Sequence, residues 1–216
     1  MASQSEVGHA KNVANFADII AYCTAYGTTY NPSKTALQLT ELNTLLATAQ
    51  TELANVTTAK NTFNTVTGDR QLTFEPLKPL ATKVFNYLSV TDAISEIIAD
   101  AKTINNKLQG KRTGTTAENP PTEGENQNNT VSVSRQSYDM LTENFASFVD
   151  LVSSVPSYTP NETELTTASL TAYLGELQTA NTNVINAEVA YSNARISRNS
   201  VLYSENTGLV DIASDV

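Results

Sequence analysis

The stretch LNTLLATAQTELANVTTAKNTF, residues 42–63, is the part of this sequence that decides its fold. Its apolar side chains recur every seven residues, at Leu42, Ala49, Val56 and Phe63. A seven-residue apolar step over three or more heptads is typical of a long helix that packs along a partner helix at a shallow angle. The pattern therefore predicts a helix over 33–66, about 50 Å long.

A second stretch of the same kind, LTAYLGELQTANTNVINAEVAY, follows 128 residues later at 170–191. Its matching apolar positions are Leu170, Leu177, Val184 and Tyr191. The preceding segments also match, since TYNPS (29–33) corresponds to SYTPN (157–161). Similarity at a constant shift over roughly 60 residues indicates an internal duplication. We predict a second long helix over 161–196, with Pro32 and Pro160 at the first helical positions.

Shorter amphipathic helices surround these two long ones. Apolar residues at spacings of three and four predict helices over 9–27 and 135–154. A further helix begins near Phe74, and another runs to Leu108, where Gly110 is a helix stop signal. The chain shows no alternation typical of strands, so the prediction is an all-α protein.

The segment between the matching halves lacks apolar periodicity and is rich in Pro, Gly, Asn and Glu. It is predicted to be a flexible linker at 111–132. We expect two tandem homologous antiparallel helical bundles, at 8–110 and 133–216. They either pack against each other with pseudo-twofold symmetry or are joined as beads by the linker.

The second bundle is expected to be C-terminally incomplete, because its match to the first ends at Val216. Either the native chain extends beyond Val216, or a neighbouring molecule supplies the missing packing. The apolar residues of this last segment then form a candidate interface. They are Leu209, Val210, Ile212 and Val216.

The charge balance narrows the classes of partner. Lysine and arginine number 13 against 22 acidic residues, for a formal net charge of −9. Phosphate backbones and anionic membrane surfaces both require a basic footprint, so neither nucleic acid nor such a membrane is an expected partner. No stretch approaches the roughly 20 apolar residues of a membrane span. The N-terminus lacks the pattern of a secretory signal, so the expected location is cytoplasmic, with a particle or surface assembly left open.

Few residues suit catalysis or metal binding. The chain has one histidine, His9, and one cysteine, Cys23, which excludes the usual zinc sites within one chain. Asp92, Glu96 and Asp100 share a helix face, and a solvated face is the favoured interpretation. No phosphate-binding or nucleophile motif is present. We expect no cofactor and no catalytic residue, and predict that the protein is not an enzyme.

Three arginines lie at or near the predicted ends of the long helices: Arg70, Arg195 and Arg198. Arginine near a helix C-terminus bonds the last carbonyls and interacts favourably with the helix dipole. The favoured interpretation is a structural clamp between helices, and the minority interpretation is anion binding.

These features favour a non-catalytic structural or scaffold protein that self-associates through long helix faces. The long-helix plan and a surface of neutral threonine and asparagine both suit close contact between copies, as a homo-oligomer or larger assembly. One alternative is an adaptor that binds another protein in a groove between the bundles. A second is a small-ligand carrier or enzyme with a site between the halves.

Four segments carry a resemblance to a known family: INNKLQGKR (104–112), ENF (143–145), YTPNETEL (158–165) and NARISRNSVLYSENTGLVDIASDV (193–216). They resemble an uncharacterised family of all-helical, internally duplicated hypothetical proteins of Bacteroidota. The resemblance implies a bacterial origin and a further helical stretch beyond Val216. It implies no activity.

Overall fold

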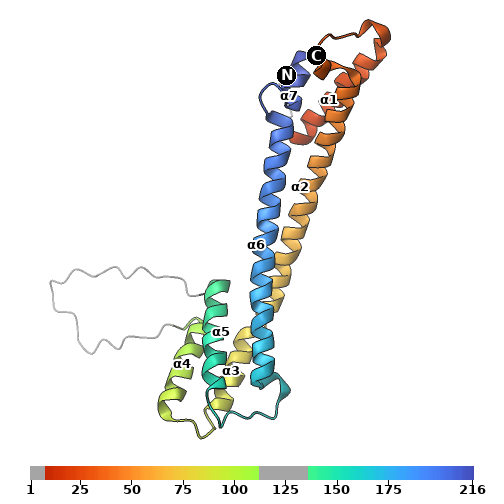
Figure 1. The fold of residues 1–216 in the computed structure, drawn as a ribbon. Coiled ribbons are helices and arrows are strands. Elements are labelled where there is room, and N and C mark those ends of the chain that lie inside the picture. The colour runs from red at the N-terminus through yellow and green to blue at the C-terminus, as the bar shows by residue number, and fades with distance from the viewer. Residues whose placement is uncertain (1–7, 112–135) are drawn as a thin grey trace, which may run out of the picture. The chain divides into compact units, whose positions relative to one another are not determined.

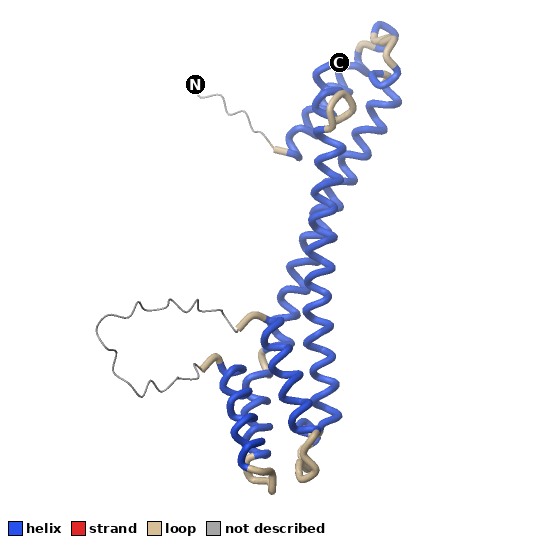
Figure 2. The backbone as a smooth tube through the Cα atoms, turned by 60° about the vertical axis from the view of Figure 1, so that its left-hand side comes forward, coloured by secondary structure: helices blue, strands red, loops and turns tan. Residues whose placement is uncertain are grey.

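The computed structural model describes residues 8–111 and 136–216, and all regular secondary structure in these residues is helical (Figures 1 and 2). The α-helices are α1 (His9–Ala25), α2 (Leu39–Phe74), α3 (Leu77–Leu88), α4 (Ser95–Gln109), α5 (Tyr138–Ser153), α6 (Thr167–Tyr203) and α7 (Leu209–Asp215). Three short 3-10 helices are η1 (Gly27–Thr29), η2 (Thr35–Leu37) and η3 (Thr163–Leu165). The prediction of an all-α protein is confirmed. The predicted linker lies outside the described residues except for Lys111.

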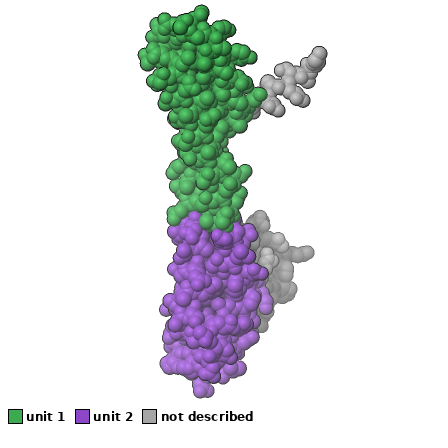
Figure 3. Space-filling model, turned by 90° about the vertical axis from the view of Figure 1, so that its right-hand side faces the viewer, with its two compact units in different colours: residues 1–66, 184–216 green, residues 67–183 purple. Residues whose placement is uncertain are grey.

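The chain forms two compact units, and each combines segments from both halves of the sequence (Figure 3). Unit 1 consists of Met1–Val66 with Val184–Val216, and unit 2 consists of Thr67–Asn183. This division differs from the predicted bundles at 8–110 and 133–216. The physical reason is the length of the long helices, because α2 and α6 each contribute one segment to unit 1 and another to unit 2.

Unit 1 contains α1, the first part of α2, the last part of α6, and α7. Its buried core residues are Val13, Phe16, Ile20, Leu42, Ala49, Leu202, Leu209 and Ile212. Leu42 shares this core with Leu202, whereas Phe63 stacks on Tyr191 with 6.3 Å between ring centroids. Residue numbers therefore rise along α2 as they fall along α6, so the two segments are antiparallel.

Unit 2 contains the end of α2, α3, α4, α5 and the start of α6. Helix α4 packs against both α3 and α5. The ring of Phe145 on α5 makes a T-shaped contact with Tyr173 on α6, with 5.6 Å between centroids. The Tyr173 hydroxyl donates a 2.7 Å hydrogen bond to the carbonyl of Thr73, which ties α6 to α2. Tyr173 thus joins α6 to α5 through its ring and to α2 through its hydroxyl.

The long helices begin with the same local structure. Tyr30 Oη donates a 2.7 Å hydrogen bond to the Leu37 carbonyl, and Tyr158 Oη donates a 2.9 Å bond to the Leu165 carbonyl. Each bond closes over a 3-10 turn, and the α-helix begins two residues after it. The predicted starts at 33 and 161, with the prolines in the first helical position, were therefore wrong. The 3-10 turns separate those prolines from the helices.

The helix ends show which stop signals operate. Helix α2 continues through Gly68 to Phe74, past the predicted end at 66, and Pro76 follows it. Proline disfavours a helical conformation in the residue before it, which explains the later stop. Gly110 follows α4 with φ of 73° in the left-handed region, so this predicted stop is confirmed.

One buried and one partly buried phenol are expected to make the stability of unit 2 sensitive to alkaline pH. Burial raises the pKa of Tyr158 to about 12 and, with Glu176 adding to the effect, raises the pKa of Tyr173 to about 12. The folded state therefore holds both protons where the unfolded chain, near its usual pKa of 10, has begun to lose them. We expect the stabilisation that these two hydroxyls contribute to the folded state to be fully present below pH 10 and to be lost as the pH rises to 12. Urea denaturation at several pH values measures this.

The control is the Tyr158→Phe, Tyr173→Phe double variant. It is less stable at neutral pH, because two carbonyls lose a hydrogen-bond partner. Its stability should change less between pH 10 and pH 12 than that of the unchanged chain. Equal alkaline losses in both proteins would contradict the assignment to these phenols.

Candidate functional site

The second half of α6 carries a row of exposed apolar side chains, which we call the α6 stripe. Its members are Ile185, Val189, Ile196 and Tyr203. Each is between 44% and 64% exposed. Their spacings of four, seven and seven place them within an arc of about 40° on the helix and over about 27 Å of its length. Single exposed apolar residues are ordinary, whereas an aligned row marks a candidate interaction surface.

The matching face of α2 is polar. A shift of 128 relates Ile185 to Thr57 and Val189 to Asn61. Thr57 and Asn61 are also exposed, so the two helices present the same face to solvent with different chemistry. The α6 stripe is therefore present on only one of the two long helices. Burial of the opposite helix face does not require such a stripe, because α2 buries its own inner face without one.

Charged groups flank the stripe on one side. Glu188 and Arg195 are exposed and seven residues apart, so they share a position in the heptad. The Arg195 guanidinium lies 5.6 Å from the ring centroid of Tyr191, one turn earlier on the same helix. One carboxylate and one guanidinium are thus available beside the apolar row.

The single histidine lies at the C-terminal end of the stripe. The Tyr203 hydroxyl is 2.7 Å from His9 Nδ1 and accepts a 3.2 Å hydrogen bond from Asn12 Nδ2. Partial burial, followed by the nearby Arg198 guanidinium, lowers the pKa of His9. These contacts tie the start of α1 to the end of α6 and occupy the imidazole within unit 1.

The three arginines of the predicted clamp make three different contacts. The Arg70 guanidinium lies 4.1 Å from the ring centroid of Tyr138, so it joins α2 to α5. Arg195 lies over Tyr191 of its own helix, and Arg198 donates to the side chain of its neighbour Asn199. Only Arg70 is thus seen to bridge two helices, and the clamp as a common role stays a prediction.

The predicted interface at the end of the chain is partly buried. Leu209 and Ile212 are 1% and 3% exposed in the core of unit 1, so they are not part of an open surface. They are buried because α7 contacts α1 and η2. Val210 is partly buried against the same core, and Val216 remains exposed. This differs from the expectation that all four lack packing.

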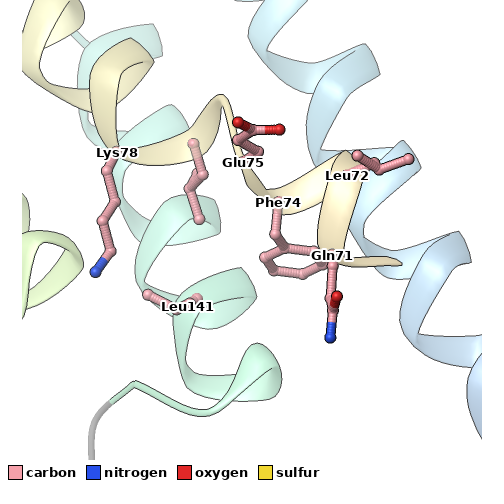
Figure 4. Close-up of a pocket in the computed structure, with 7 residues that line it drawn as sticks. Gln71, Leu72, Phe74, Glu75, Lys78 and Leu141 are labelled. Carbon is pink, nitrogen blue, oxygen red and sulfur yellow. The ribbon is translucent and has the colours of Figure 1, made fainter. Parts of the chain in front are cut away.

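Unit 2 has an open groove of about 470 Å³ beside the junction of α2 and α3. Gln71, Leu72, Phe74, Glu75, Leu77, Lys78 and Leu141 line it (Figure 4). The Glu75 carboxylate and the Lys78 ammonium group point in different directions (Figure 4). Lys78 Nζ also donates a 2.9 Å hydrogen bond to Gln136. The polar groups that line the groove therefore do not converge on one point.

Residues 8–111 and 136–216 contain no group of three or more histidine, cysteine, aspartate or glutamate side chains placed to hold a metal ion. Over the same residues, no helix combines the length and apolar character needed to cross a membrane.

Comparison of the chain with protein-family models, curated proteins and solved structures finds no match. The resemblance to helical proteins of Bacteroidota therefore stays a prediction.

Proposed function

We propose that the protein is a non-catalytic scaffold that self-associates through the α6 stripe. The observation that carries this proposal is the alignment of Ile185, Val189, Ile196 and Tyr203 on one exposed helix face. A second copy that covers this face removes their apolar surface from water. Full burial of one such side chain stabilises the dimer by about 1.5–3 kcal/mol. The engagement of His9 with Tyr203 and the burial of Cys23 support a non-catalytic role.

The charges beside the stripe favour an antiparallel pair. In heptad terms Val189 and Ile196 occupy position a, Ile185 position d, and Glu188 and Arg195 position g. When two such helices run antiparallel, a residues pack against d residues and g residues flank g residues. With Ile185 of one copy against Ile196 of the other, each Glu188 lies beside the other copy's Arg195. The contact is self-complementary and closes as a twofold dimer.

An internal duplication is part of the same proposal. The matching hydrogen bonds of Tyr30 and Tyr158, and helix starts separated by 128 residues, support it. The stack of Phe63 on Tyr191 also supports it, because these rings occupy matched positions. Divergence after duplication then leaves one long helix with an apolar outer face and the other with a polar one. One docking face per chain gives a closed dimer rather than an open polymer.

A matched pair of double variants tests the surface. Ile185→Asp, Val189→Asp places two charges on the stripe, and Thr57→Asp, Asn61→Asp places them at the matched positions of α2. We expect the first variant to weaken dimerisation at least about tenfold in sedimentation velocity, since each buried unpaired charge is costly. The second should leave it unchanged. Circular dichroism checks that both variants remain helical.

A charge exchange tests the orientation. Glu188→Arg and Arg195→Glu should each weaken the dimer, because each leaves like charges facing across the twofold axis. The double exchange should restore it. A parallel pair would show no such rescue. An unchanged chain that stays monomeric at all accessible concentrations would refute self-association. A dimer whose affinity none of these changes alters would refute the α6 stripe as its contact.

A further inference from the structure

An ion pair in each unit joins the segment around a 3-10 turn to the short helix packed against that turn. In unit 1, η2 contacts α7, and Lys34 Nζ lies 2.6 Å from Asp215 Oδ2. In unit 2, η3 contacts α3, and Lys83 Nζ lies 2.8 Å from Glu164 Oε1. In both units the turn comes from one half of the sequence and the short helix from the other half. Each ion pair therefore links the two halves of the chain.

The short helices α3 and α7 bury matched faces. A shift of 128 relates two buried residues of α3 to two buried residues of α7. These pairs are Ala81 with Leu209 and Val84 with Ile212. The shift that relates the long helices therefore also relates the short helices that pack in the two units.

The two ion pairs have opposite polarity. The shift of 128 matches Lys34 with Glu162, two residues before the acidic member of the ion pair in unit 2. It matches Lys83 with Asp211, one turn before the acidic member of the ion pair in unit 1. In unit 1 the turn is basic and the short helix is acidic, whereas in unit 2 the turn is acidic and the short helix is basic. The two halves are thus alike in their buried faces and opposite in these charges.

Halves with matched buried faces can also pair between two copies of the chain, as in domain swapping. We call the product, in which first half pairs with first half and second half with second half, the exchanged dimer. Its first halves would bring Lys34 beside the other copy's Lys83. Its second halves would bring Glu164 beside the other copy's Asp215. Both contacts join like charges, which disfavours the exchanged dimer.

A hydrogen bond adds to the same preference. His9, in the first turn of α1, lies 2.7 Å from the hydroxyl of Tyr203, the last residue of α6. The equivalent contact in unit 2 joins Tyr138, at the start of α5, to Phe74, the last residue of α2, with 4.8 Å between ring centroids. Pairing of two first halves would place His9 against Phe74, which has no hydroxyl group. The exchanged dimer would therefore lose this hydrogen bond as well.

We propose that the two ion pairs of opposite polarity select the pairing of the two halves within one chain, and oppose their exchange between copies. The proposal rests on the internal duplication proposed above. It goes beyond self-association through the α6 stripe, because it concerns which halves form each unit. The four side chains are about half-exposed, and a single exposed ion pair stabilises a protein little. The selection comes from the difference between the two assemblies, since exchange replaces every one of these attractive contacts with a repulsive one.

Reversal of one ion pair tests the proposal in the full chain. The test is made in a chain that carries Ile185→Asp, Val189→Asp, which we call the background chain, so that the α6 stripe does not contribute. Addition of Lys83→Glu, Glu164→Lys gives unit 2 the polarity of unit 1 and keeps an ion pair in each unit. The exchanged dimer now also joins opposite charges. After refolding from urea at high protein concentration, we expect its fraction in sedimentation velocity to rise at least about tenfold over the background chain.

The matched control reverses the second ion pair as well. Further addition of Lys34→Glu, Asp215→Lys restores opposite polarity with all four charges inverted, so the exchanged dimer should return to the background level. The three chains should have similar urea midpoints, because each keeps both ion pairs, and circular dichroism checks that all are helical. A role of these residues in stability alone would not change the dimer fraction in this alternating way. High salt should reduce the difference between the chains.

The other outcomes also decide the matter. Equal dimer fractions in the three refolded chains, or no dimer in any of them, would overturn the proposal. A dimer that also forms when folded chains are simply mixed is a surface contact, because exchange of halves requires unfolding, and it would overturn the proposal too. A background chain that dimerises without refolding would count against the α6 stripe alone, since the fraction formed by refolding still tests the ion pairs.

Discussion

Replacement of Phe145 by alanine is expected to lower the free energy of unfolding by about 3–5 kcal/mol, the range for deletion of a buried phenylalanine ring. Phe145 is fully buried in the core of unit 2, and its ring contacts Tyr173 at 5.6 Å between centroids. Its loss leaves a cavity between helices that belong to different parts of the chain, and close-packed interiors collapse only partly around such gaps. Urea denaturation followed by circular dichroism measures the change.

Tyr22→Ala is the matched control for this prediction. It also removes an aromatic ring from an α-helix, but the ring is 69% exposed. Surface substitutions of this kind usually change stability by less than about 0.5 kcal/mol. Similar losses for the two variants would show that Phe145 packs less tightly than its burial indicates.

The long helices could be predicted because their apolar period is regular. Leu42 and Ala49 in α2, and Leu170 and Leu177 in α6, are fully buried, as the heptads indicate. Their bounds could not be predicted from periodicity. The starts depend on hydroxyl-to-carbonyl bonds made by Tyr30 and Tyr158 across a 3-10 turn, which leave no sign in the hydropathy pattern.

The compact units could not be predicted from contiguous sequence. A helix as long as α2, at 36 residues, exceeds what one small core can cover, so each of its ends packs with a different set of helices. The length of α6 likewise explains why Leu209 and Ile212 are buried, because the end of α6 packs with the helices of unit 1. The match between the halves ends at Val216 and so predicts an open interface for them, whereas the structure packs them with Leu202 and α1.

The α6 stripe could have been found from the sequence. The heptad of Leu170, Leu177 and Val184 indicates the buried face of α6, and the exposed face carries its own signal. Ile185 and Val189 align with Thr57 and Asn61 under the same shift of 128. An apolar residue at one exposed position, where the residue matched to it is polar, is a signal of surface function that the shift of 128 makes visible.

The turn between α6 and α7 leaves no room for a side chain at Gly208. A Cβ atom at this position would lie 2.6 Å from the backbone nitrogen of Ser204 and 2.7 Å from its carbonyl oxygen. The turn is closed by a 2.7 Å hydrogen bond from Gly208 N–H to that same carbonyl, and α7 begins at the next residue. Gly208 thus lets α7 fold back so that Leu209 enters the core of unit 1.

Gly208→Ala is therefore expected to destabilise the protein by about 1–3 kcal/mol, the usual cost of overpacking. Rotation of a side chain cannot relieve the clash, because the atoms met are backbone, so Leu209 has to move with the turn. Gly175→Ala is the control: it lies inside α6, its Cβ would meet nothing within 4 Å, and alanine favours the helix by roughly 0.5–1 kcal/mol. Opposite signs in thermal denaturation would establish the close approach at Gly208, whereas a neutral Gly208→Ala would mean that α7 is free to shift on the core.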